Sequence, residues 1–156
     1  MATVTLAESG VAHLADWSPW VPFRPEVVHS VPRTSGVYMH REHRTHQVVY
    51  AGMTGDRSGD GMRGRLSIYA LGRAPHSGLG SLCLDRALAD LAWMKERLTR
   101  LEAGEQWTTV DWAGAAVIRA DLEVRWASTS SPKEAGDLED AVLAAWTHEP
   151  LWNRKR

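Results

Sequence analysis

The sequence has almost no cysteine and no long hydrophobic run. Cys83 is the single cysteine of the 156 residues, so the chain cannot close an internal disulfide and does not resemble a disulfide-built secreted domain. A reducing, cytoplasmic compartment is therefore expected. No apolar run approaches the ~18 residues of a membrane-spanning helix, and residues 1–8 lack the basic and then apolar pattern of a signal peptide. We expect no membrane partner.

Lysine is also scarce. The chain has 18 basic and 19 acidic residues and a formal net charge of −1, and this balance by itself does not indicate a nucleic-acid partner. Nearly all of the basic residues are arginines, whose planar guanidinium groups suit bidentate contacts with phosphate. Four of them fall in one short stretch: Arg57, Arg63, Arg65 and Arg73. A solvated surface of mixed charge is the simpler interpretation of this stretch, and phosphate binding is the functional one.

Length and composition are those of one ordinary globular domain. Apolar residues make up 44% of the chain and charged residues 24%, which excludes global disorder. A chain of this length buries ~70% of the surface that it exposes when unfolded. Residues 1–32 contain four prolines and cannot form a long helix. Because Trp17 and Trp20 would otherwise be exposed, we expect an irregular N-terminal arm packed on the core, followed by a domain over residues 33–156.

Two short β-rich runs, 36–41 and 47–52, flank a polar stretch and predict a β-hairpin. If the turn centres on Arg44, Tyr38 lies directly opposite Tyr50, and both rings point to one face of the sheet. A third strand is expected over 122–127. Helical sequence is predicted over 62–72, 81–102 (with a break near Asp90), 109–119 and 133–146. This order predicts an α+β fold with a small three-stranded sheet.

Several patterns suggest other functions, but each has a simpler structural interpretation. Residues 59–64 fit the dinucleotide-binding pattern G-x-G-x-x-G, but they follow a hairpin rather than a strand of a βαβ unit, so we expect a tight turn into a helix. His40, His43 and His46 would not converge on one metal ion in a hairpin, so an exposed, partly cationic tip is expected. Most of the eight tryptophans lie on stripes that face the core, and Cys83 on its leucine-rich helix is expected to be buried and inert.

Glu139 is an unusual residue for its position. It precedes Val142 and Trp146 by three and seven residues, so it shares their inward side of the predicted last helix. Asp140 is rotated ~100° further round and is expected to be solvated. An inward carboxylate is costly unless a cation or a hydrogen-bond donor meets it. The structural explanation is a salt bridge, for example with Arg65, and the functional explanation is a ligand for a divalent metal ion.

These residues form a series with a known counterpart. The triplet 36–38 reads Gly-Val-Tyr and the triplet 50–52 reads Tyr-Ala-Gly, with eleven residues between them. Four further positions follow in the chain: Arg65 and Tyr69 on the first helix, Glu139 on the last helix and Asn153 after Pro-Leu-Trp. The series resembles the GIY-YIG nuclease family over about residues 33–153. The resemblance implies a three-stranded antiparallel sheet flanked by helices in the order β-β-α-α-β-α, here with an extra helical insertion around 80–119.

The resemblance also implies a metal-dependent endonuclease that hydrolyses phosphodiester bonds. DNA is the favoured nucleic-acid substrate, RNA is left open, and one Mg²⁺ (or Mn²⁺) ion per active site is the implied cofactor. Carried over by position, Glu139 would hold the metal and Arg65 would contact the scissile phosphate. Tyr38 and Tyr50 would line the site, one of them positioning or deprotonating the attacking water. Tyr69 would assist near the phosphate or the water, and Asn153 would brace the site by hydrogen bonding.

Physical chemistry agrees with those implied roles. Cleavage of a phosphodiester builds negative charge on the phosphate oxygens, which a prepositioned metal ion and guanidinium stabilise. A phenol has a pKa of ~10, so a tyrosine base needs neighbouring cations that lower it. The metal and the local arginines are the expected source of that charge. Further contacts with nucleic acid are expected from Arg44 at the hairpin tip and from Arg57, Arg63 and Arg73.

The series departs from the family pattern in two places, and other functions stay open. Ala51 replaces the usual branched residue of the second triplet, and the loop before the first helix has no lysine to activate a base. A catalytically silent module on the same fold, which binds nucleic acid or protein, is the second hypothesis. An unrelated α+β domain with a structural Glu139–Arg65 pair is the third. A homodimer is also open, since one active site cuts one strand per visit.

Overall fold

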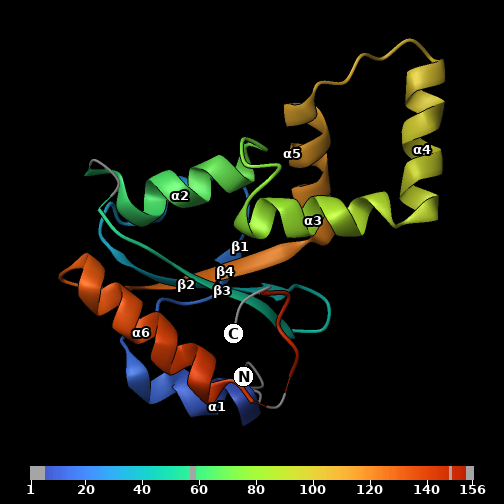
Figure 1. The fold of residues 1–156 in the computed structure, drawn as a ribbon. Coiled ribbons are helices and arrows are strands. Elements are labelled where there is room, and N and C mark those ends of the chain that lie inside the picture. The colour runs from blue at the N-terminus through green and yellow to red at the C-terminus, as the bar shows by residue number, and fades with distance from the viewer. Residues whose placement is uncertain (1–5, 57–58, 148, 154–156) are drawn as a thin grey trace.

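The computed structural model describes residues 6–56, 59–147 and 149–153, and its fold is α+β (Figure 1). One antiparallel sheet has the strand order β1-β4-β2-β3. The strands are Val21–Pro22 (β1), Gly36–Glu42 (β2), Val48–Thr54 (β3) and Leu122–Ser128 (β4). The α+β class is confirmed, but the prediction of three strands is wrong, because β1 adds a fourth. A two-residue edge strand ending in proline shows no alternating pattern from which it could be predicted.

The helices agree with the expected helical insertion around 80–119 and extend the expected element order at its start. The described helices are Leu6–Val11 (α1), Gly61–Ala70 (α2), Gly78–Leu88 (α3), Leu91–Glu102 (α4), Thr109–Ala120 (α5) and Pro132–Ala145 (α6). Because α1 and β1 precede the hairpin, the order β-β-α-α-β-α is incomplete. The break near Asp90 is confirmed: Asp90 caps α4, its carboxylate accepting a hydrogen bond of 3.2 Å from the backbone N–H of Trp93.

The N-terminal arm packs on the core, but it is not irregular throughout. Besides α1 and β1 it contains two single-turn 3-10 helices, Ala12–Leu14 and Val28–Ser30. Phe23 is buried, and its backbone N–H donates to the carbonyl of Leu122 at 2.8 Å. The Trp20 indole donates to the Glu8 carboxylate at 2.9 Å. The arm is therefore tied to the sheet by both apolar burial and hydrogen bonds.

The hairpin forms, but its register differs from the expected one. Tyr38 pairs with Gly52 and His40 pairs with Tyr50, and a bulge after His40 shifts the pairing so that Arg41 faces Val48. The expected direct pairing of Tyr38 with Tyr50 is therefore wrong by two residues. Because side chains alternate with a period of two, a slip of two residues keeps both rings on the same face of the sheet. The bulge has no signature in the sequence that would have revealed it.

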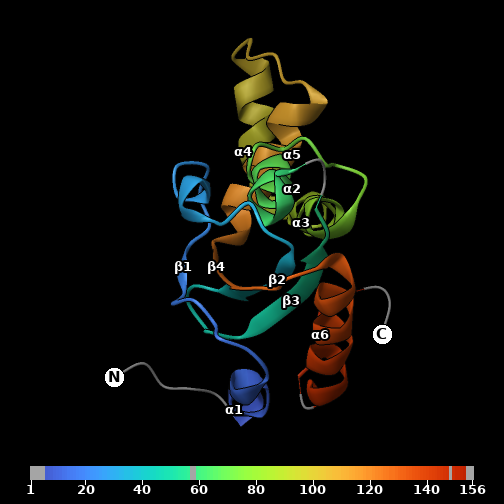
Figure 2. The same cartoon turned by 90° about the vertical axis from the view of Figure 1, so that its left-hand side faces the viewer.

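The sheet separates two packed layers (Figures 1 and 2). On one face, Tyr38 and Tyr50 pack with Leu66 and Tyr69 of α2, under α3 and α5. On the other face, buried side chains of the hairpin pack against α1 and α6. Helix α4 stands away from the sheet in Figure 1. None of the helices in the described part of the chain has both the length and the apolar character that crossing a bilayer requires.

Candidate active site

The hairpin places two phenol rings side by side. The rings of Tyr38 and Tyr50 are nearly parallel, with centroids 6.4 Å apart and an interplanar angle of 23°. Tyr38 is 1% exposed and Tyr50 is 8% exposed. Gly52, which pairs with Tyr38, makes this arrangement possible, since a Cβ there would lie 2.9 Å from the Tyr38 hydroxyl. The Tyr38 ring therefore lies across the neighbouring strand, toward Tyr50.

Helix α2 brings Arg65 and Tyr69 to the same place. These residues are one helical turn apart, and the guanidinium carbon of Arg65 lies 4.7 Å from the centre of the Tyr69 ring. The Tyr69 hydroxyl is buried and contributes to the pKa of both hairpin phenols. Gly78, the first residue of α3, covers the Tyr69 and Tyr50 hydroxyls, and a Cβ at Gly78 would overlap with the Tyr69 oxygen. The site thus has three phenols and one guanidinium from three elements.

Burial makes both hairpin phenols weak acids. Desolvation raises the pKa of Tyr38 well above its usual value, and the neighbouring Tyr69 and Tyr50 raise it further. Desolvation likewise raises the pKa of Tyr50, with smaller contributions from Tyr69 and Glu139. Arg65 lowers both values but does not outweigh burial. In the ligand-free chain Arg65 alone does not bring either phenol within reach of neutral pH, and the expected lowering by a metal ion together with the arginines stays a prediction.

Glu139 belongs to the layer opposite this cluster. Its helix, α6, lies beside the edge strand β3 and on the other side of the sheet from α2 (Figure 2). The Glu139 carboxylate is the smallest of the contributions that raise the pKa of the Tyr50 phenol. The edge strand β3, which carries Tyr50, is the strand that α6 lies beside. The expected Glu139–Arg65 salt bridge is not formed within the described residues.

The environment of Glu139 is unusual for a structural carboxylate. Its side chain is half-buried, and burial followed by Asp140 raises its pKa. No ion pair or hydrogen bond joins it to another described residue, whereas Asp140 is exposed as expected. A half-buried carboxylate without a partner is destabilising by itself. It is the kind of group that a bound cation would compensate.

Asn153 holds the edge strand that carries Tyr50. Its side-chain amide donates to the carbonyl of Ala51 at 2.6 Å and accepts from the N–H of Ala51 at 3.2 Å. The N–H of Trp152 adds a hydrogen bond of 2.6 Å to the carbonyl of Val49. The C-terminal segment therefore pairs with β3 much as a further strand would. These hydrogen bonds satisfy backbone groups of the edge strand at Val49 and Ala51, and so they fix the position of Tyr50, which lies between these two residues.

The four arginines expected to contact nucleic acid have different surroundings. Arg57 lies outside the described residues. Arg63 is half-buried, and its Nε donates to the carbonyl of Val31 at 2.8 Å, so it holds the N-terminal arm. Arg73 is exposed just after α2, and Arg44 is exposed at the hairpin tip. Arg73 and Arg44 are thus the two of these arginines whose side chains the structure leaves at the surface.

His40 is a member of this cluster that the sequence interpretation missed. It was expected in an exposed tip, but it is fully buried, with its ring 5.8 Å from the Tyr38 ring and 6.1 Å from the Tyr50 ring. Burial lowers the pKa of His40 to about 3. Neither ring nitrogen has a hydrogen-bond partner in the described part of the chain. Strand alternation from Tyr38 was the signal that could have placed it on this face.

The residues present fit a single divalent cation of the magnesium type. Within residues 6–56, 59–147 and 149–153 there is no cluster of three His, Cys, Asp or Glu side chains that could hold a metal ion. Magnesium instead keeps several waters and uses one or two carboxylates together with substrate phosphate. The Glu139 carboxylate, which has no partner among the described residues, matches that requirement.

Comparisons with protein-family models, with curated proteins and with solved structures found no match.

Proposed function

We propose that this chain is a metal-dependent endonuclease that hydrolyses phosphodiester bonds, with DNA as the favoured substrate, through a site of the GIY-YIG type. One observation carries the proposal: the Arg65 guanidinium and three phenols converge from α2, β2 and β3, and the Glu139 carboxylate of α6 contributes to the pKa of one of these phenols, Tyr50. A guanidinium, together with a carboxylate that has no ion pair among the described residues, suits a reaction in which negative charge develops on phosphate oxygens. The resemblance of the sequence supports the same assignment.

Each residue then has a role that its surroundings allow. Arg65, the partly exposed guanidinium of the cluster, donates to the oxygens of the scissile phosphate. Glu139 would hold the metal ion, which when bound supplies Lewis acidity toward a phosphoryl oxygen. Tyr38 and Tyr50 are protonated at neutral pH, so their hydroxyls act as hydrogen-bond donors that orient the phosphate and the attacking water. A phenol that accepts a proton needs more positive charge nearby than Arg65 alone provides.

A plasmid-nicking assay tests this proposal. Supercoiled DNA is incubated with the protein and Mg²⁺, Mn²⁺ or EDTA, with an RNA substrate in parallel. We expect nicking that requires the metal and falls at least ~100-fold in Glu139→Ala, equivalent to about 2.7 kcal/mol of transition-state stabilisation. Asp140→Ala is the matched control, because Asp140 is the exposed neighbour on the same helix. Cleavage that survives in Glu139→Ala, or that is lost equally in Asp140→Ala, refutes the assignment.

Burial of the site favours a second function that the same assay separates. Tyr38 and Tyr69 are each only 1% exposed, and a substrate has to reach Arg65 and Tyr50 from the sheet edge. A catalytically silent module that binds nucleic acid fits this enclosure. Binding without cleavage in any divalent ion would support the silent module, and cleavage would exclude it.

A further inference from the structure

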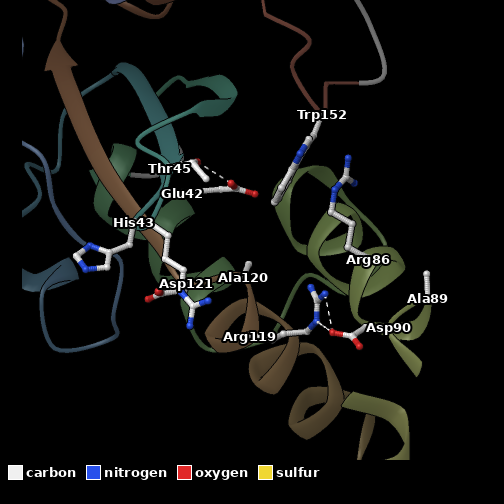
Figure 3. Close-up of a pocket in the computed structure, with 11 residues that line it drawn as sticks. Glu42, His43, Thr45, Arg86, Ala89, Asp90, Arg119, Ala120, Asp121 and Trp152 are labelled. Carbon is white, nitrogen blue, oxygen red and sulfur yellow. Dashed lines mark hydrogen bonds and ion pairs between the residues drawn. The ribbon is translucent and has the colours of Figure 1, made fainter. Parts of the chain in front are cut away.

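A cavity beside the candidate site has no part in the proposed chemistry. Its volume is about 700 Å³, and it lies between the hairpin tip, the C-terminal ends of α3 and α5, and Trp152 (Figure 3). Trp152 also connects it to the site, since the backbone N–H of Trp152 bonds to Val49, the residue before Tyr50. The cavity and the phenol cluster are therefore neighbours along β3.

Helix α3 joins the two places. Gly78 at its start covers the Tyr50 and Tyr69 hydroxyls, and Arg86 near its end lines the cavity. Eight residues of helix span ~12 Å. This is roughly three to four nucleotides at the B-form rise of about 3.4 Å per nucleotide. A strand that passes the phenol hydroxyls beside Gly78 can therefore reach Arg86 within a few nucleotides.

The walls of the cavity are held in place without a ligand. The backbone N–H of His43 donates to the carbonyl of Asp121 at 2.9 Å, which joins the hairpin tip to the start of β4. Arg119 pairs with Asp90 at 2.9 Å across α5 and the start of α4. The guanidinium carbon of Arg86 lies 4.0 Å from the centre of the Trp152 ring. These contacts preorganise the site, which lowers the entropic cost of binding.

The chemistry of the lining suits one nucleotide better than a bare anion. Arg44 is exposed and forms no ion pair with a described residue, so its charge is available for a phosphate. The acids are partly committed, since Asp90 pairs with Arg119 and Asp121 pairs with Arg24 at 3.3 Å. Among the residues that the structure describes, the Glu42 carboxylate accepts a side-chain hydrogen bond from the Thr45 hydroxyl alone, at 2.8 Å. A carboxylate can accept from the amino or imino edge of a base, while an aromatic wall packs against its ring.

We propose that this cavity binds one unpaired nucleotide of a nucleic-acid strand, with the base against Trp152 and the phosphate on Arg44. The location of the cavity beside the cleavage site rests on the proposed function, but the binding itself does not. A free mononucleotide has the same chemistry, and the test separates it from a strand.

The test is binding in EDTA, so that cleavage does not interfere. Fluorescence anisotropy measures the affinity of a labelled ten-nucleotide single strand and of the matching duplex. We expect Trp152→Leu to weaken single-strand binding about tenfold, as loss of one stacked base does. We expect Arg44→Ala to reduce the salt dependence of single-strand binding by a slope of about 0.7. Arg100→Ala is the charge-matched control, because this exposed α4 arginine pairs with Glu96 outside the cavity.

Each outcome decides the matter. Loss of single-strand affinity in Arg44→Ala, with duplex affinity retained, supports the inference even if Trp152→Leu folds poorly. Equal loss on single strand and duplex overturns it, because a backbone contact alone would explain that result. Affinity for the strand that is unchanged in Arg44→Ala, together with saturable binding of 5′-mononucleotides, also overturns it. If cleavage requires Glu139 but is unchanged in Arg44→Ala and Trp152→Leu, the proposed nuclease function is retained and the proposed nucleotide site is refuted.

Discussion

Protonation of His40 sets how the stability of the fold changes with pH. The imidazole is fully buried against Phe23, Tyr38 and Tyr50, and burial lowers its pKa from 6.5 to about 3. Between these two values the unfolded chain binds a proton that the folded chain does not. Stability is therefore complete above pH ~6.5 and declines as the pH falls toward 3.

The structure gives the size of the effect. One pKa unit corresponds to 1.36 kcal/mol, so a shift from 6.5 to about 3 costs at most about 5 kcal/mol in strong acid. At pH 5 the unfolded chain is already mostly protonated at this position while the folded chain is not, and the cost is about 2 kcal/mol. Even the cost of about 2 kcal/mol at pH 5 is a large share of the ~5–15 kcal/mol that stabilises a typical domain.

The assay is urea unfolding of the parent protein and of His40→Phe at pH 7.5, 6 and 5. Phenylalanine fills the site with a ring that does not titrate, so its stability lacks this contribution. We expect the free energy of unfolding of the parent to fall by about 2 kcal/mol relative to His40→Phe between pH 7.5 and 5. His43→Gln, at the exposed tip, should not reproduce that change. Parallel pH profiles for the parent and His40→Phe would refute the reasoning.

Three other variants or probes test the packing around the site. Gly78→Ala places a Cβ on a left-handed backbone, where it overlaps with the Tyr69 hydroxyl. It should therefore lower Tm by more than Gly104→Ala, which also places a Cβ at a positive φ but in open space. Asn153→Ala removes both hydrogen bonds to Ala51 and should cost about 1–2 kcal/mol in urea unfolding, and Asn153→Asp should not restore the loss, because a carboxylate oxygen would replace the amide donor that faces the Ala51 carbonyl. Burial raises the pKa of Cys83 to about 12, so a disulfide reagent at pH 8 should label it only after unfolding; labelling in native buffer contradicts its burial.

Local sequence patterns were sufficient for the elements that carry the site. Alternation predicted the hairpin, helical spacing predicted that Glu139 turns inward while Asp140 turns outward, and Asp90 marked the break between α3 and α4. These features depend on residues within one or two turns of each other. The start of α6 was likewise predictable from adjacent residues: Pro132 is its first residue, and the Ser131 side chain accepts from the N–H of Glu134 at 3.1 Å.

Features that depend on distant segments were not predictable in this way. The bulge after His40 shifts the register, and the two-residue strand β1 forms because β4 is available to pair with it. The burial of His40 needs Phe23 from the N-terminal arm as well as the hairpin. The cavity is likewise built by residues as far apart as Glu42 and Trp152. In each case contacts between distant segments determine the local structure, and no local sequence pattern predicts such contacts.

The edge strand β3 explains how residues from opposite layers act on one hydroxyl. A side chain on α6 cannot reach α2 through the sheet, because packed apolar layers fill both faces. It can act around the edge, and β3 is that edge. An uncovered edge strand would fray, and Tyr50 would move with it. The hydrogen bonds from Trp152 and Asn153 prevent this, so the C-terminal segment positions the phenol although it contributes no reacting group.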